Sequence, residues 1–227
     1  SKDRQKTRLR KDLNALRKGY AEDTELGRRR TSLEEAGQAR EISLEAFVER
    51  EPVTVILSKR GWIKAMKGHV DLNARADFKF KEGDGPAHAF HAQTTDKILL
   101  ATANGRFYTL GADKLPGARG FGEPVATMVD IEAGNDIVSI LPVVPAGRML
   151  LAATTGKGFI AKMSEVVAET RKGRGVVTLK PGAKLQVVRM APAEAADEEV
   201  RKDQYVAVVG DNRKLVVFPL SEIPEMA

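Results

Sequence analysis

The sequence predicts a mainly β, propeller-like fold with about four to five blades that each open with a hairpin. A unit of two short apolar runs separated by a Gly or Asn turn recurs from residue 51 onward. Its copies span residues 53–66, 97–110, 148–163 and 204–220. A period of roughly forty to fifty residues with several short strands in each copy is typical of a propeller-like array.

The strand predictions rest on residue type. In residues 53–58, VTVILS, β-branched residues dominate and apolar side chains occupy both faces, which predicts a strand buried on both sides. Each turn carries residues that tolerate positive φ: Arg60-Gly61, Asn104-Gly105, Thr155-Gly156-Lys157-Gly158 and Asp211-Asn212. After each of the last three hairpins the chain is expected to cross to a neighbour, at Leu115-Pro116, Val166-Val167 and Ile223-Pro224.

The first fifty residues differ from the repeats. Leu9, Leu13, Leu16 and Tyr20 are spaced four, three and four apart, which predicts a helix with one narrow apolar seam. We therefore expect residues 1–26 to be the helical tail of an upstream coiled coil. Residues 27–50 are expected to be a linker with a short helix capped by Ser43, and residues 51–227 a propeller domain cut before its last blade is complete.

Composition narrows the class of protein. The 227 residues are 42% hydrophobic and 30% charged, which fits a folded chain with a sizeable core. The absence of cysteine excludes a disulfide scaffold, a thiolate zinc site and a cysteine nucleophile. Since no apolar run approaches the roughly eighteen residues of a spanning helix, we expect a cytoplasmic protein.

The net charge of +6 is unevenly distributed. Residues 1–50 hold 13 basic and 10 acidic side chains, residues 51–186 hold 19 and 13, and residues 187–227 hold 5 and 8. The basic excess therefore belongs to the first three repeats, where it would attract a polyanion, nucleic acid first. A solvated basic face with no partner is the alternative.

The loops that follow the hairpins combine glycine with Lys or Arg, at residues 64–69, 116–124 and 170–175. Glycine lets a backbone approach a ligand closely, and the cations suit phosphate contacts. Because the loops recur at the same place in successive repeats, they are expected to form a continuous basic track along one edge. The candidate DNA-binding residues are Lys59, Arg60, Lys64, Lys67, Arg106, Arg119, Lys157, Arg171, Lys172 and Arg174. The four in or beside turns, Lys59, Arg60, Arg106 and Lys157, could equally face solvent.

Several of these runs resemble a known family. Residues 51–58, followed by Arg60-Gly61-Trp62-Ile63-Lys64 and Lys67-Gly68-His69, are similar to the opening blade of the C-terminal domain of the bacterial topoisomerase IV A protein. Residues 105–108 and 115–124 continue the likeness in the second copy. Upstream, residues 27–31 and 41–45 resemble the linker that precedes this domain in topoisomerase IV and gyrase A proteins.

The resemblance implies a β-pinwheel, a disc whose blades exchange strands and whose basic rim binds and bends duplex DNA. The domain would present a DNA segment to the cleavage core for ATP-dependent decatenation and relaxation during chromosome segregation, in the bacterial cytoplasm at the nucleoid. Gyrase A proteins carry a Q-R-R-G-G-K-G loop in the first blade, and residues 67–77 lack it. That departure favours topoisomerase IV over gyrase, and degenerate versions of the loop remain at residues 118–122 and 171–175.

The same resemblance implies a domain without catalytic, cofactor-binding or metal-binding residues. ATP and Mg²⁺ would act in other domains of the parent enzyme, and the partners would be duplex DNA, the upstream cleavage core and the ATPase component of a heterotetramer. His69, His88 and His91 have no acidic cluster at metal-ligand spacing and are interpreted as structural or solvated. Three alternatives stay open: a gyrase-type wrapping domain, a protein-interaction scaffold whose basic face is incidental, and a fragment that contacts the rest of its own enzyme.

Overall fold

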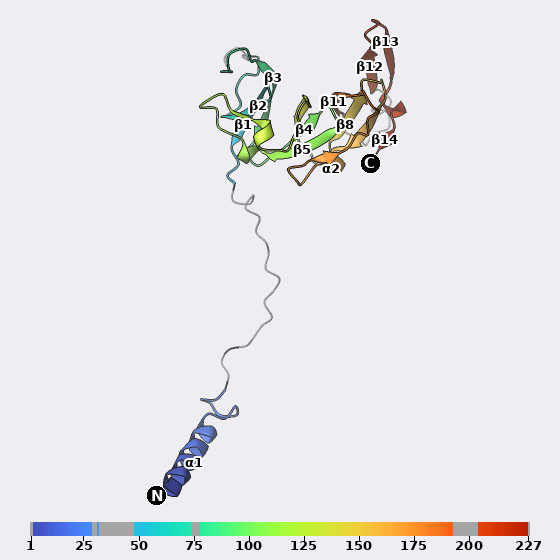
Figure 1. Ribbon diagram of the computed structural model, residues 1–227. Helices are drawn as coiled ribbons and strands as arrows, with labels where there is room; N and C mark the ends of the chain where they lie inside the picture. The colour runs from blue at the N-terminus through green and yellow to red at the C-terminus, as the bar shows by residue number, and fades with distance from the viewer. Residues whose placement is uncertain (1, 29–30, 32–47, 74–77, 193–203, 227) are drawn as a thin grey trace. The chain divides into compact units, whose positions relative to one another are not determined.

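The computed structural model describes residues 2–28, 31, 48–73, 78–192 and 204–226. Contacts divide the chain into two units, residues 1–43 and residues 44–227 (Figure 1). The first unit contains helix α1 (Lys2–Gly19), which confirms the predicted helix. Its seam residues Leu9, Leu13 and Leu16 are all more than half exposed. The short helix predicted from Ser43 falls mainly on residues 43–47, outside the described part of the chain. None of the described helices is long and apolar enough to cross a membrane.

Each repeat in the second unit opens with the predicted hairpin. The hairpin strands are β1 (Pro52–Ser58) with β2 (Trp62–Lys67), β4 (Lys97–Thr102) with β5 (Arg106–Gly111), β8 (Arg148–Ala153) with β9 (Gly158–Lys162), and β12 (Tyr205–Val209) with β13 (Leu215–Pro219). Gly61, Gly105 and Gly156 adopt positive φ in the first three turns. In the fourth turn the residue with positive φ is Arg213, not Asp211 or Asn212 as expected.

A third strand pairs with the first strand of each of the first three hairpins. These strands are β3 (Pro86–Gln93) beside β1, β7 (Ile137–Pro142) beside β4, and β11 (Leu185–Ala191) beside β8. Each of these strands pairs antiparallel with its neighbour. On this side, therefore, the hairpin is extended by a strand that lies further along the chain in the same repeat.

The other side of each of the first three hairpins receives a strand from the following repeat. Strand β6 (Glu123–Pro124) follows β5 in the chain but pairs with β2, and β10 (Arg174–Gly175) follows β9 but pairs with β5. Strand β14 (Glu225–Met226) follows β13 and lies parallel to β9. Single turns of helix join these segments: η3 (Ala112–Lys114), η4 (Val125–Thr127), α2 (Met163–Val166) and η5 (Leu220–Glu222). This exchange confirms the propeller-like β-pinwheel that the sequence predicted.

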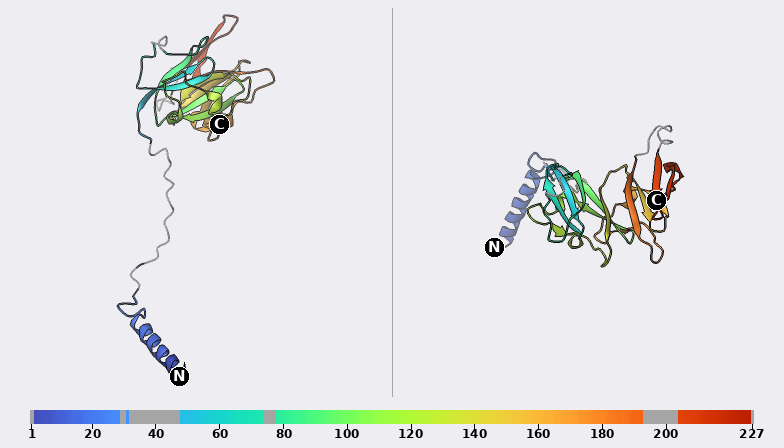
Figure 2. Two further views of the ribbon diagram at one scale, coloured as in Figure 1. Left: turned by 60° about the vertical axis from the view of Figure 1, so that its left-hand side comes forward. Right: turned by 90° about the horizontal axis from the view of Figure 1, so that it is seen from above.

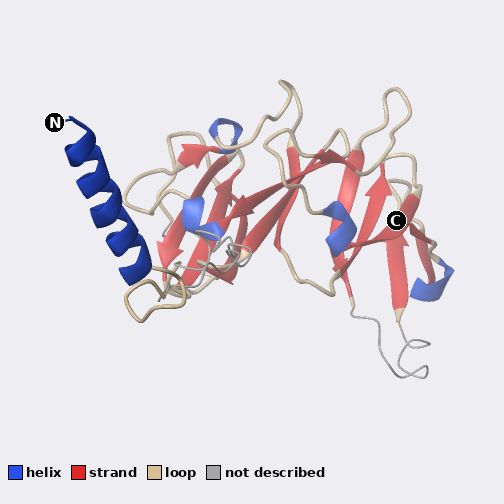
Figure 3. Ribbon diagram, turned by 90° about the horizontal axis from the view of Figure 1, so that it is seen from below, coloured by secondary structure: helices blue, strands red, loops and turns tan. Residues whose placement is uncertain are grey.

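Successive sheets pack face to face because their strands bury both faces. In β4, Ile98 and Leu100 join the cluster with Val55 of the first sheet, whereas Leu99 and Ala101 join the cluster with Leu151 of the third. The two faces therefore alternate along the strand with a period of two, as a strand buried on both sides requires. The colours of Figure 2 show the sheets following one another in chain order, and Figure 3 shows their strands in red.

The fourth sheet differs from the first three, since only β12 and β13 form it among the described residues. Its apolar side chains are correspondingly open, with Val209 70% and Leu215 61% exposed. Three four-stranded sheets and one hairpin thus account for the repeats of the sequence.

Candidate nucleic-acid interface

Strand exchange brings the basic loops at residues 115–122 and 167–173 toward one end of the strands. We call this end the turn edge. It is the end at which residues 59–61, 103–105 and 154–157 form the hairpin turns. Glu123 pairs with Ile63 and Arg174 pairs with Phe107, in each case just past the turn glycine of the preceding sheet. The two exchanged strands, β6 and β10, therefore occupy equivalent positions. The amides that follow them agree, since Val125 N–H donates to Gly61 O at 2.9 Å and Val176 N–H donates to Gly105 O at 3.0 Å.

One glycine in each loop allows this close approach. Gly122 and Gly173 immediately precede the exchanged strands and both have positive φ, 88° and 65°. A Cβ at Gly122 would overlap the carbonyl oxygen of Ile63, and one at Gly173 would overlap that of Phe107. Only glycine fits either position, so the backbones of both loops are fixed against the preceding sheet.

Lys64 fastens the first loop, residues 115–122. Its side chain is buried, and its Nζ donates to Lys79 O at 2.6 Å and to Gly120 O at 3.4 Å. Burial, followed by the nearby charge of Lys79, lowers the pKa of Lys64 below its usual 10.5. Ala65 N–H also donates to Pro116 O at 2.9 Å. Lys64, a predicted phosphate ligand, therefore uses its charge inside the fold.

Arg106 fastens the second loop, residues 167–173. The guanidinium is half-buried, and its Nη2 donates to Lys172 O at 2.8 Å and to Gly173 O at 3.4 Å. Arg171 adds a bond from its Nη2 to Thr127 O at 2.7 Å and lies 3.9 Å from Asp130 Oδ1. Both arginines keep part of their surface open, but their hydrogen bonds hold the loop.

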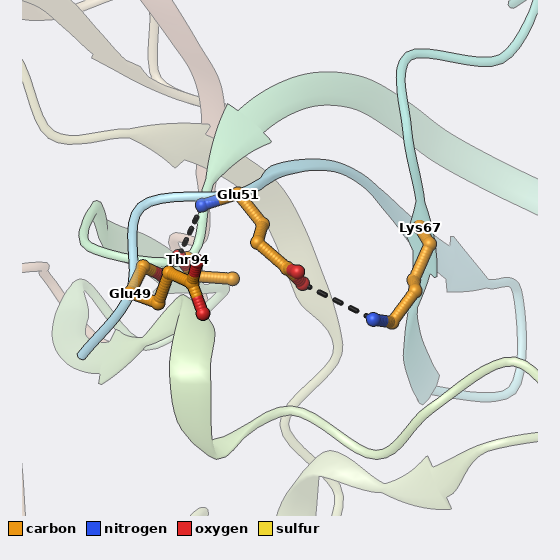
Figure 4. Close-up of polar contacts among 4 residues, drawn as sticks. All are labelled: Glu49, Glu51, Lys67 and Thr94. Carbon is orange, nitrogen blue, oxygen red and sulfur yellow. Dashed lines mark hydrogen bonds and ion pairs between the residues drawn. The ribbon is translucent and has the colours of Figure 1, made fainter.

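The remaining candidates are exposed. Five of them make no side-chain hydrogen bond or ion pair to any described residue: Lys59, Arg119, Lys157, Lys172 and Arg174. Arg60 is exposed beside Asp84, to whose Oδ1 its backbone N–H donates at 3.1 Å. Lys67 ends β2 at the opposite end from the turn and pairs with Glu51 at 3.2 Å (Figure 4). The structure thus gathers most candidates at the turn edge and leaves Lys67 away from it.

A cavity of about 620 Å³ brings three of the cations together. Its lining includes Lys157 of the third turn, Arg174 of β10 and Lys180, together with apolar residues such as Leu151 and Leu179. Lys180 was not among the predicted residues, because it lies five positions past the glycine loop, in a Lys-Pro-Gly turn. Lys59 and Arg60 line a separate cavity of about 360 Å³ beside β6.

His69, His91 and the buried Tyr108 make their contacts with other residues of the fold. The rings of His69 and His91 stack with centroids 4.4 Å apart, and their Nε2 atoms lie 3.2 Å from Ala92 O and 2.8 Å from Val70 O. Tyr108 is fully buried and donates to Asp130 O at 3.3 Å. Within the described ranges, no three His, Asp or Glu residues are grouped closely enough to hold a metal ion.

Comparison with known proteins identifies the fold's family. A family model described as the DNA gyrase C-terminal domain, a beta-propeller, matches residues 96–143, 148–190 and 204–227. The chain belongs to this family. The three matched segments begin at or just before the second, third and fourth hairpins of this chain. The first hairpin lies outside the matched segments.

Relatives of this gyrase-family domain cover the first hairpin as well. The DNA topoisomerase 4 A protein of Rickettsia bellii is 37% identical over 219 residues, 96% of this chain and 28% of that protein. Its counterpart in Caulobacter vibrioides is 40% identical over 185 residues, 81% of this chain and 22% of that protein. The chain thus spans less than a third of the length of these curated relatives. Among solved structures, the Escherichia coli ParC C-terminal domain superimposes with a TM-score of 0.66 at 28% identity, over 78% of this chain and 68% of that one.

Proposed function

We propose that this chain is the non-catalytic C-terminal domain of a topoisomerase IV A protein, and that it binds and bends duplex DNA along the turn edge. One observation carries the proposal: exchanged strands and internal clamps fix two equivalent loops that leave Arg119, Lys172 and Arg174 exposed and unpaired. The relatives' name and the family support the parent enzyme. The missing gyrase loop at residues 67–77 favours bending over the full wrapping of a gyrase.

These cations suit the phosphate backbone rather than base sequence. Each Lys or Arg that neutralises a phosphate releases a condensed counterion, so affinity falls as salt rises and is similar for all sequences. Smoothly bending 20–30 base pairs by 40–90° costs on the order of 1–6 kcal/mol, which added contacts along a track can offset. Fixed loops help because little backbone entropy of the loop is lost on binding.

In the parent enzyme, the domain would present the bent DNA segment to the cleavage core of the same polypeptide. ATP would be hydrolysed by the partner protein of the heterotetramer. That arrangement serves decatenation and relaxation at the nucleoid of the bacterial cytoplasm. The role requires no chemistry from this chain, only a DNA surface of fixed shape.

Electrophoretic mobility of a short duplex over a range of salt tests the proposal. Neutralising Arg119→Gln, Lys172→Gln and Arg174→Gln together should lower the slope of log K against log salt by about three, at any DNA sequence. A matched control neutralises three cations at the opposite ends of the strands, Lys67→Gln, Lys97→Gln and Lys114→Gln, and should leave the slope unchanged. Absence of binding at low salt, or equal slopes for both triple variants, would overturn the proposal.

A further inference from the structure

Phe121 is an exposed aromatic ring in the middle of the first basic loop. It is 46% exposed and follows Arg119-Gly120, directly before the fixed Gly122. Single exposed apolar side chains are common on protein surfaces, so exposure alone carries no argument. The place of this ring in the repeat does.

The repeat puts Phe121 where the neighbouring copy puts a cation. Gly122 and Gly173 are equivalent, because each precedes an exchanged strand and each lies on a carbonyl of the preceding sheet. The residue before the glycine is therefore Phe121 in one loop and Lys172 in the other. If Lys172 meets a DNA backbone, the equivalent position of the first loop meets the same duplex with an apolar ring.

The loop backbone on both sides of this ring is held in place. Lys64 bonds the carbonyl of Gly120, Ala65 bonds that of Pro116, and Gly122 rests on Ile63. With the backbone fixed on both sides, Phe121 has little freedom to fold back onto the core. Neither of the two large hydrophobic clusters includes it.

We propose that Phe121 inserts as a wedge between base pairs of the bound duplex and concentrates the bend at this loop, with Arg119 holding the adjacent phosphate. The inference rests on the proposed DNA-binding function. Apolar side chains inserted from the minor groove unstack a base step and kink DNA by roughly 20–90°. Pyrimidine–purine steps unstack most easily, so the kink should favour a TA step although no base edge is read.

The test measures bending and unstacking separately from affinity. The full chain is mixed with a duplex that carries fluorophores at both ends and 2-aminopurine at a central TA step. Wild type should shorten the end-to-end distance and raise the 2-aminopurine emission. Phe121→Ala should lose most of both signals while its affinity falls less than about tenfold and its salt slope stays the same. Phe121→Trp should keep both signals.

Phe121→Lys copies the second loop and separates the two kinds of contact. It should raise the salt slope by about one, since one phosphate contact is gained, and still lose the 2-aminopurine signal. Full bending and full 2-aminopurine emission with Phe121→Ala would overturn the wedge but not DNA binding. Failure of wild type to bind at low salt would instead overturn the proposed function.

Discussion

The loops at residues 115–122 and 167–173 meet the preceding sheet through an equivalent glycine and exchanged strand but are fastened by different side chains. The first is held by Lys64, from the middle of β2, and the second by Arg106, from the start of β5. The pairing of β2 with β6 and of β5 with β10 makes Arg106 equivalent to Trp62, and Lys64 equivalent to the buried Tyr108. The ring of Trp62 is covered instead by Lys81, whose Nζ lies 3.6 Å from the ring centroid. The two clamps therefore do not occupy one shared position of the repeat.

This difference shows that backbone geometry fixes the glycine of each repeat but not the side chain that fastens the loop. The glycine before the exchanged strand has no alternative, because any side chain would meet a carbonyl of the preceding sheet. The clamp only has to offer buried or half-buried donors to loop carbonyls, which a lysine or an arginine can do. The first loop is thus held by one cation and the second by two, and each leaves at least one cation open to a ligand.

The largest effect should come from the two glycines. Gly122→Ala and Gly173→Ala each combine a positive φ with a backbone overlap, and each should lower the free energy of unfolding by about 3 kcal/mol or more. Denaturant unfolding of each variant measures this. Gly120→Ala and Gly175→Ala are matched controls, since a Cβ there meets no atom within 4 Å. Equal stability of Gly122→Ala and Gly120→Ala would show that the loop is not fixed as described.

Replacing the buried clamp of the first loop should have a smaller effect. Lys64→Met keeps most of the volume but leaves the carbonyls of Lys79 and Gly120 without their donor, which should cost about 2 kcal/mol. Lys114→Met, on an exposed lysine, is the control and should be nearly neutral. A Lys64→Met variant as stable as the control would mean that the ammonium contributes nothing to holding the loop.

The lowered pKa of Lys64 gives this clamp a pH signature. Between that pKa and 10.5 the folded chain releases a proton that the unfolded chain still holds, so this lysine makes stability rise with pH in that window. Comparing the pH dependence of unfolding for wild type and Lys64→Met isolates the effect. A variant curve that runs parallel to wild type through this window would contradict it.

The half-exposed clamp of the second loop should matter least for stability. Arg106→Met removes the donors to Lys172 O and Gly173 O, but water can reach these carbonyls, so the expected loss is about 1 kcal/mol. Because the loop then loosens, the duplex affinity should fall more than removal of one phosphate contact explains. Arg106→Lys, which restores charge without the planar fork, should recover only part of that affinity. Full recovery would show that Arg106 acts as a simple phosphate ligand.

The sequence predicted the repeated architecture correctly, but it did not indicate which cations make hydrogen bonds within the fold. Hairpins are local, so Arg60-Gly61 and Asn104-Gly105 predicted their turns correctly, and the likeness of residues 115–124 to a known domain predicted exchange. The role of Arg106 depends on carbonyls 66 and 67 residues later, which no local pattern reveals. The sequence pattern does not distinguish Lys64 from the cations of the loops. In the structure it lies within β2 and donates to the carbonyls of residues 79 and 120.

Site-directed crosslinking tests the central claim, that duplex DNA runs along the turn edge, most directly. Because the chain has no cysteine, a single introduced thiol carrying a photo-crosslinker reports one position. Arg119→Cys and Lys172→Cys should crosslink to a bound duplex at low salt, whereas Lys67→Cys and Lys114→Cys, at the opposite ends of the strands, should not. Crosslinks from the latter pair without crosslinks from the former would contradict the account.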